Sequence, residues 1–154
     1  RDLVRSRGLG DVYKRQTIMG DNVNLAARLE SAGKQYQVYT MISEETRRQA
    51  GEVAEYRELD AIRVKGREQP VRIFEILGKK GEVDPRRLAA ARIFEKGLEL
   101  YRQRYWLPAV EQFKKALEIF PGDGPSRVFI ARCAEYSDNP PGSGWDGVYT
   151  MTTK

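Results

Sequence analysis

The spacing of apolar and polar residues changes near residue 80, from short mixed elements to long helical stripes. The elements predicted before that point are a strand that begins at Thr17, a helix over 21–32, a strand over 37–42, a short helix over 43–51 and two strands over 56–65 and 70–77. Ser43 is a suitable N-cap for the short helix, because its side-chain oxygen can accept from the free amides of the first turn. The two strands flank the turn-prone residues 66–69, so a β-hairpin is the simplest arrangement.

From about Asp84 the apolar residues recur at spacings of three and four, which is typical of amphipathic helices. The first stripe consists of Leu88, Ala91, Phe94, Leu98 and Tyr101, and the second of Trp106, Ala109, Val110, Phe113, Ala116, Leu117 and Phe120. We expect the first helix to end near Arg104. A third helix should begin at Pro125, a residue suited to the first helical position, and run to about Tyr136. Residues 138–154 form a Pro/Gly-rich linker and a short β-prone tail.

Composition removes several kinds of chemistry. The chain has 154 residues, which fits one ordinary domain or two small ones. Cys133 is the only cysteine and there is no histidine, so an intramolecular disulfide, a histidine-based zinc site and Ser/His/Asp or Cys/His catalysis are excluded. No apolar run approaches membrane-spanning length, so we expect no membrane segment in this chain.

Residues 1–16 show neither a helical stripe nor strand alternation, and we expect them to be non-native or disordered. They resemble an adapter-derived run found at the ends of genes assembled from environmental DNA. The alternative is a native, flexible basic arm. The segment holds five basic and two acidic residues and so supplies +3 of the net charge of +5. The rest of the chain therefore predicts a mixed-charge surface and no nucleic-acid partner.

The run TIMGDNVNLAARLES, Thr17 to Ser31, carries the strongest functional signal. Asn24 and Arg28 are four residues apart on a predicted helix, so both side chains lie on one face and can reach one ligand. The run closely resembles the second half of the active site of class III nucleotide cyclases. The later segment RVKGREQPVRIFEI, which contains Lys65, resembles the same family at the expected distance.

The resemblance implies an α+β fold and an order of domains. Residues 17–80 would be the C-terminal part of a ferredoxin-like βαββαβ catalytic domain. Residues 84–137 resemble one tetratricopeptide repeat, a helical hairpin with a third, capping helix; a single repeat favours a packing role over a peptide-binding one. The helical region and tail together resemble the end of bacterial cyclases that carry a CHASE2-type sensor. We therefore expect a cytoplasmic location, as part of a membrane-anchored full-length protein.

The resemblance also assigns residue roles in a reaction that forms a cyclic nucleotide from a nucleoside triphosphate with release of pyrophosphate, in intracellular signal transduction. Asn24 matches the residue that orients the ribose, and Arg28 the residue that stabilises the transition state. Lys65 matches the lysine on the terminal phosphates. Thr17 matches a purine-selecting position and favours ATP over GTP. Taken singly, each of the four residues also fits an ordinary structural role, as an exposed helical pair, a hairpin cation or a strand residue.

The family uses Mg²⁺ or Mn²⁺, and its two metal-binding aspartates would lie upstream of Thr17. Asp2 and Asp11 do not match them, so we predict no metal ligand in this chain. The family's site forms between two cyclase domains of a homodimer. We therefore expect a fragment that is inactive alone. It could complement a metal-bearing partner, although we expect poor folding of the cyclase half. The alternative is a non-catalytic dimerisation or interaction module with a degenerate cyclase domain.

Overall fold

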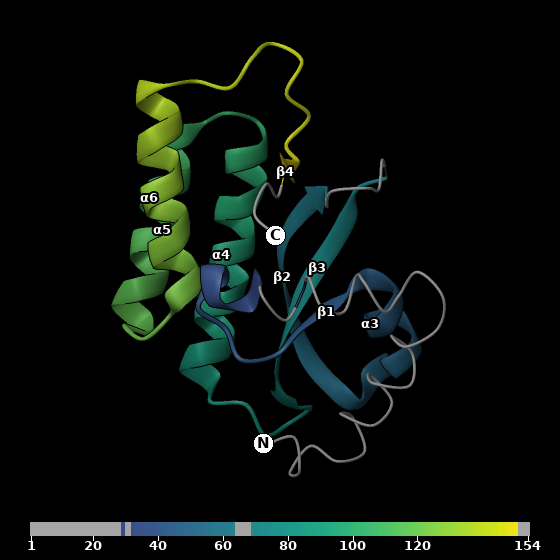
Figure 1. Ribbon diagram of the computed structural model, residues 1–154. Coiled ribbons are helices and arrows are strands. Elements are labelled where there is room, and N and C mark those ends of the chain that lie inside the picture. Colours follow the sequence, from purple (N-terminus) through teal and green to yellow (C-terminus); the bar gives the residue numbers. More distant parts are fainter. Residues whose placement is uncertain (1–28, 30–31, 64–68, 151–154) are drawn as a thin grey trace.

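The computed structural model describes residues 29, 32–63 and 69–150. Residues 32–36 are helical, and the elements that follow are β1 (Met41–Ser43), α3 (Glu44–Ala50), the 3-10 turn η2 (Gly51–Val53), β2 (Ala54–Arg63), β3 (Val71–Lys79), α4 (Pro85–Arg102), α5 (Trp106–Ile119), α6 (Gly124–Asp138) and β4 (Tyr149–Thr150). The strands form one mixed sheet in the order β1–β3–β2–β4. Figure 1 shows α4, α5 and α6 together on one side of this sheet and α3 on the other. The predicted α+β class is confirmed.

The predicted hairpin and short helix are present. β2 and β3 pair antiparallel, from Ile62 opposite Val71 to Ala54 opposite Lys79. The side-chain oxygen of Ser43 accepts from the amide of Thr46 at 3.2 Å, and the helix ends at Gly51, whose φ of 73° suits glycine.

The strand predicted over 37–42 is wrong over its first four residues. β1 begins only at Met41, because Gln37 has a φ of 59° and ends the preceding helical turn instead. Its amide donates to the carbonyl of Lys34, and the amide of Val38 donates to that of Gly33, both at 3.1 Å. The helix predicted to end at Ala32 therefore continues to residue 36; its earlier part, apart from residue 29, lies outside the described residues.

Two irregularities in β2 decide which side chains face the helices. The register with β3 shifts between Glu55 and Tyr56 and again between Glu58 and Asp60. Side chains normally alternate between the faces of a strand, so Arg57 and Asp60, three residues apart, would point to opposite faces. The extra residue at Leu59 brings both to the face covered by the helices.

The sheet and the three long helices share one hydrophobic core. The main cluster combines Leu59 and Ile62 of β2 with Phe94 of α4, Phe113 of α5 and Phe129 of α6, all of them fully or nearly fully buried. A smaller cluster, which includes Ile42, Tyr56 and Phe74, fills the face under α3. The change of pattern near residue 80 thus separates two kinds of secondary structure within one continuous core.

The chain returns to the sheet after α6. Trp145 packs edge-to-face on Tyr101 at 5.5 Å and lies 5.7 Å from the rings of Trp106 and Tyr136. β4 then pairs parallel with the end of β2. Within the described residues, the segment predicted as a linker and tail therefore packs through Trp145 against α4, α5 and α6.

α4 covers the part of the β2 edge that β4 leaves unpaired. Glu95 accepts from the amide of Glu58 at 2.9 Å, and Arg102 pairs with the Glu58 carboxylate at 2.9 Å. Arg92 pairs with Glu55 at 3.4 Å. Charged side chains at an open edge discourage pairing with another strand, so α4 both packs on the sheet and protects its edge.

The α4–α5 contact depends on Gly97. A Cβ atom at this position would lie 2.5 Å from Cε1 of Phe113, closer than packed carbon atoms approach. The glycine of the GLELY run therefore allows the two helices to meet, with the Phe113 ring lying directly over the α4 backbone.

We expect Gly97→Ala to lower the free energy of unfolding by about 1–3 kcal/mol, because overpacking against Phe113 outweighs the better helix propensity of alanine. Urea denaturation of the four proteins in a double-mutant cycle with Phe113→Leu measures this. In the Phe113→Leu background the ring is gone, and the same alanine should cost less. An equal cost in both backgrounds would mean that the close approach is not responsible.

Candidate functional site

The four residues that sequence analysis assigns to the site are Thr17, Asn24, Arg28 and Lys65, and all four lie outside the described residues. Their roles stay predictions. Among their immediate neighbours in the sequence, the structure describes one residue, Leu29. Leu29, which follows Arg28, is 1% exposed and belongs to the main hydrophobic cluster.

The described residues do not fit a Mg²⁺ or Mn²⁺ site. Within them, no group of three or more Asp, Glu, Cys or His side chains is placed to hold a metal ion. The buried carboxylates of Asp60, Glu75 and Asp123 each accept from an arginine instead, which leaves them unsuited to a hard cation. No described helix is long and apolar enough to span a bilayer.

A buried ion network joins β2, β3 and α6. Arg57, 1% exposed, donates to Oε1 of Glu75 from Nε at 3.0 Å and from Nη2 at 2.8 Å. It also donates to both oxygens of Asp123, at 2.6 and 3.0 Å. Ser126 donates to Asp123 and Arg87 to Glu75, and the Arg57 guanidinium lies 4.9 Å from the Phe94 ring centre. The two carboxylates are therefore held between several donors.

Charge pairing outweighs desolvation in this network. Burial acts to raise the pKa of Asp123, but hydrogen bonds from Arg57 and Ser126 and the charge of Arg57 lower it below its ordinary value of 3.8. Burial likewise acts to lower the pKa of Arg57, and pairing with Asp123 and Glu75 raises it instead. Both groups are charged at neutral pH.

A second buried pair joins the hairpin to the far part of α6. Asp60, 0% exposed, accepts from the hydroxyl of Tyr36 at 2.6 Å and from Arg132 at 2.7 Å. The Arg132 guanidinium also lies 4.5 Å from the ring centre of Phe129 and 4.0 Å from that of Tyr149. Burial and the neighbouring Asp60 raise the pKa of Tyr36, so the phenol stays a hydrogen-bond donor.

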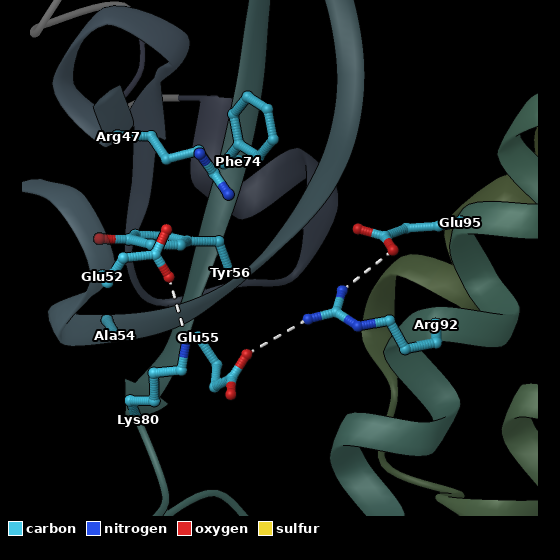
Figure 2. Close-up of a pocket in the computed structure, with 9 residues that line it drawn as sticks. All are labelled: Arg47, Glu52, Ala54, Glu55, Tyr56, Phe74, Lys80, Arg92 and Glu95. Atoms are coloured by element: carbon cyan, nitrogen blue, oxygen red, sulfur yellow. Dashed lines mark hydrogen bonds and ion pairs between the residues drawn. The ribbon is translucent and has the colours of Figure 1, made fainter. Parts of the chain in front are cut away.

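A pocket of about 270 Å³ lies among α3, the start of β2, the end of β3 and α4. Figure 2 shows Arg47 on one side of it and Arg92 with Glu95 of α4 on the other. Sequence reasoning missed it because its walls come from elements far apart in the chain.

Comparison with known proteins supports the predicted family. Residues 3–78 match the sequence model of the adenylate and guanylate cyclase catalytic domain. The chain is also 33% identical over 125 residues to an adenylate cyclase of Dictyostelium discoideum that is named terminal-differentiation specific; the alignment covers 77% of this chain and 6% of that protein. No solved structure matches the chain significantly.

These two matches support a class III nucleotide cyclase domain in this chain. The family match begins at residue 3 and so includes most of the segment that we expect to be non-native; that assignment stays a prediction. It ends at residue 78, one residue before the end of β3. The helices α4, α5 and α6 lie beyond the matched domain.

We expect Arg57→Met to lower the free energy of unfolding by about 3–5 kcal/mol, because it leaves the buried Asp123 without its charge partner. The matched control is Arg72→Met on β3. Arg72 also pairs with two carboxylates, but its side chain is 47% exposed, so its loss should cost about 1 kcal/mol or less. Denaturant unfolding of both variants checks this, and equal losses would contradict it.

Asp123 should also contribute to acid unfolding. Its folded-state pKa lies below the unfolded value, so its contribution to stability is present above the unfolded pKa and is lost as pH falls through the folded one. We expect Asp123→Asn to be less stable at neutral pH and to lose less stability than wild type below about pH 4. Unfolding free energies measured across this range check the difference in slope; parallel curves would refute the assignment.

Proposed function

We propose that this chain belongs to an enzyme that converts a nucleoside triphosphate into a cyclic nucleotide with release of pyrophosphate, with ATP preferred over GTP. The observation that carries the proposal is the match of residues 3–78 to the cyclase catalytic domain, which includes the Thr17–Ser31 run. The name of the Dictyostelium relative favours ATP, as does Thr17 at the purine-selecting position.

In this proposal Asn24 orients the ribose so that its 3′-hydroxyl faces the α-phosphorus. An amide suits this role because it can donate and accept at a fixed geometry. Arg28 offers two parallel donors to the oxygens of the reacting phosphate, and Lys65 places a positive charge on the leaving pyrophosphate. Together they supply positioning and charge neutralisation, which this chemistry needs more than covalent help.

The enzyme's divalent ion would be held by side chains outside the described residues. When bound, it would neutralise the charge that develops on the phosphates. We propose that the chain acts in a dimer, presenting Asn24, Arg28 and Lys65 to a second cyclase domain that carries the metal-binding carboxylates. On this basis the chain alone is inactive. Membrane anchoring of the full-length protein and a CHASE2-type sensor are further parts of the proposal.

A non-catalytic dimerisation or interaction module is the second candidate. The observation that favours it is the three-helix region, which follows the family match and shares its hydrophobic core with β2. The three-helix region would then be the functional part, with the cyclase-like hairpin as its support.

A complementation assay separates the two functions. The chain is mixed with a class III cyclase subunit that keeps its metal-binding carboxylates but lacks its own Asn and Arg, and cyclic AMP and cyclic GMP are measured with Mn²⁺ present. If the cyclase half folds, the catalytic proposal predicts a gain of activity that is larger with ATP. Arg28→Ala in this chain should reduce the gain at least about 100-fold, because a transition-state donor is lost.

Arg86→Ala is the matched control, since Arg86 lies at the start of α4 with its side chain 71% exposed. Circular dichroism of each variant first establishes that it is folded. A gain that survives Arg28→Ala would remove the assigned role. No gain with a folded chain would favour the interaction module.

A further inference from the structure

Arg47 of α3 is a cation at the wall of the pocket that forms no ion pair with a described residue. Its guanidinium carbon lies 4.8 Å from the ring centre of Tyr56 and 5.3 Å from that of Phe74. Its Nε atom is buried without a hydrogen bond, and within the described part of the chain its side chain forms no ion pair. Arg48, the next residue, instead pairs with Glu45 at 2.6 Å. Figure 2 shows the Arg47 guanidinium beside the Phe74 ring, on the side opposite α4.

The other charges around the pocket are already paired. Lys80 binds Glu52 at 2.9 Å, and this hydrogen bond lowers the pKa of Glu52. Arg92 binds Glu95 at 2.9 Å and Glu55 at 3.4 Å. None of these three carboxylates is hydrogen-bonded to Arg47, although its charge acts on Glu52. Among the described lining residues, Arg47 is the cation without an ion pair.

We propose that this pocket binds a small molecule through a single carboxylate or phosphate group that pairs with Arg47. A guanidinium offers parallel donors that match the oxygens of such a group, and stacking on Tyr56 and Phe74 fixes its plane. A ligand in the pocket would accept from the terminal Nη groups of Arg47, because the Nε atom is buried. The pocket volume of about 270 Å³ suits a small ligand.

The glutamates that line the pocket also disfavour the binding of larger anions. Glu52, Glu55 and Glu95 line the same pocket, and a triphosphate would bring several negative charges close to them. This proposal therefore concerns a ligand other than a nucleoside triphosphate. It goes beyond the proposed function, and its test uses binding alone.

The test is a titration of the full chain followed by NMR of the arginine Nε–H groups. The probes are sodium acetate, inorganic phosphate and tripolyphosphate, each compared with sodium chloride at equal ionic strength. We expect a saturating shift of the Arg47 signal with acetate or phosphate, half-complete at about 1–10 mM, as for one charge-assisted pair. The acetate and phosphate arms distinguish the two anionic groups. Tripolyphosphate should bind more weakly than the better of them.

The test variant is Arg47→Lys, because it keeps the positive charge but loses the planar guanidinium group with its parallel donors. Arg48→Lys is its matched control. Binding to the Arg47→Lys protein, followed by the nearby backbone amide of Phe74, should weaken at least about tenfold, and binding to the control should not change. A linear shift that chloride reproduces, or equal binding by both variants, would overturn the proposal. The wild-type titration decides the matter if Arg47→Lys does not fold.

Discussion

The buried guanidinium of Arg57 is the constraint on which the arrangement of sheet and helices depends. A fully buried charge is tolerated only where opposite charges and hydrogen bonds surround it. Its carboxylate partners come from β3 and from the N-cap of α6, 18 and 66 residues further along the chain. The network is therefore complete only when the hairpin has paired and the three helices have docked. The extra residue at Leu59 allows a second ion pair between β2 and α6, since it turns Asp60 toward Arg132.

Because of this constraint, the residues that match the cyclase domain and the three helices that follow them form a common core. The family match ends at residue 78, yet Phe94, Phe113 and Phe129 of the helices pack against the hairpin within it. The helices therefore cover one face of the sheet as a structural layer, and α4 also closes the edge of β2. The pocket at Arg47 has a wall from α4 as well, so the helical region shapes a candidate binding site near the other face.

Local signals allowed most of the elements to be predicted, and long-range contacts account for what was missed. Ser43 and Pro125 mark the starts of α3 and α6 through their own chemistry, and periodicity predicts α4, α5 and the two strands of the hairpin. Arg57 was missed because an arginine in an alternating strand looks solvent-facing until its partners, 18 and 66 residues away, are known. The packed return of the chain after α6 has no local signal either. Thr17, Asn24, Arg28 and Lys65 rest on sequence resemblance, since they lie outside the described residues.

Native-state hydrogen exchange tests the shared core most directly. If Arg57 ties the hairpin to the helices, the slowest amides of β2, β3, α4 and α6 should open together, with one common free energy equal to that of global unfolding. They should also respond equally to added denaturant. The account is contradicted if the α4–α6 amides stay protected while those of β2 and β3 exchange through a separate, lower-energy opening, because the helices would then be stable without the sheet.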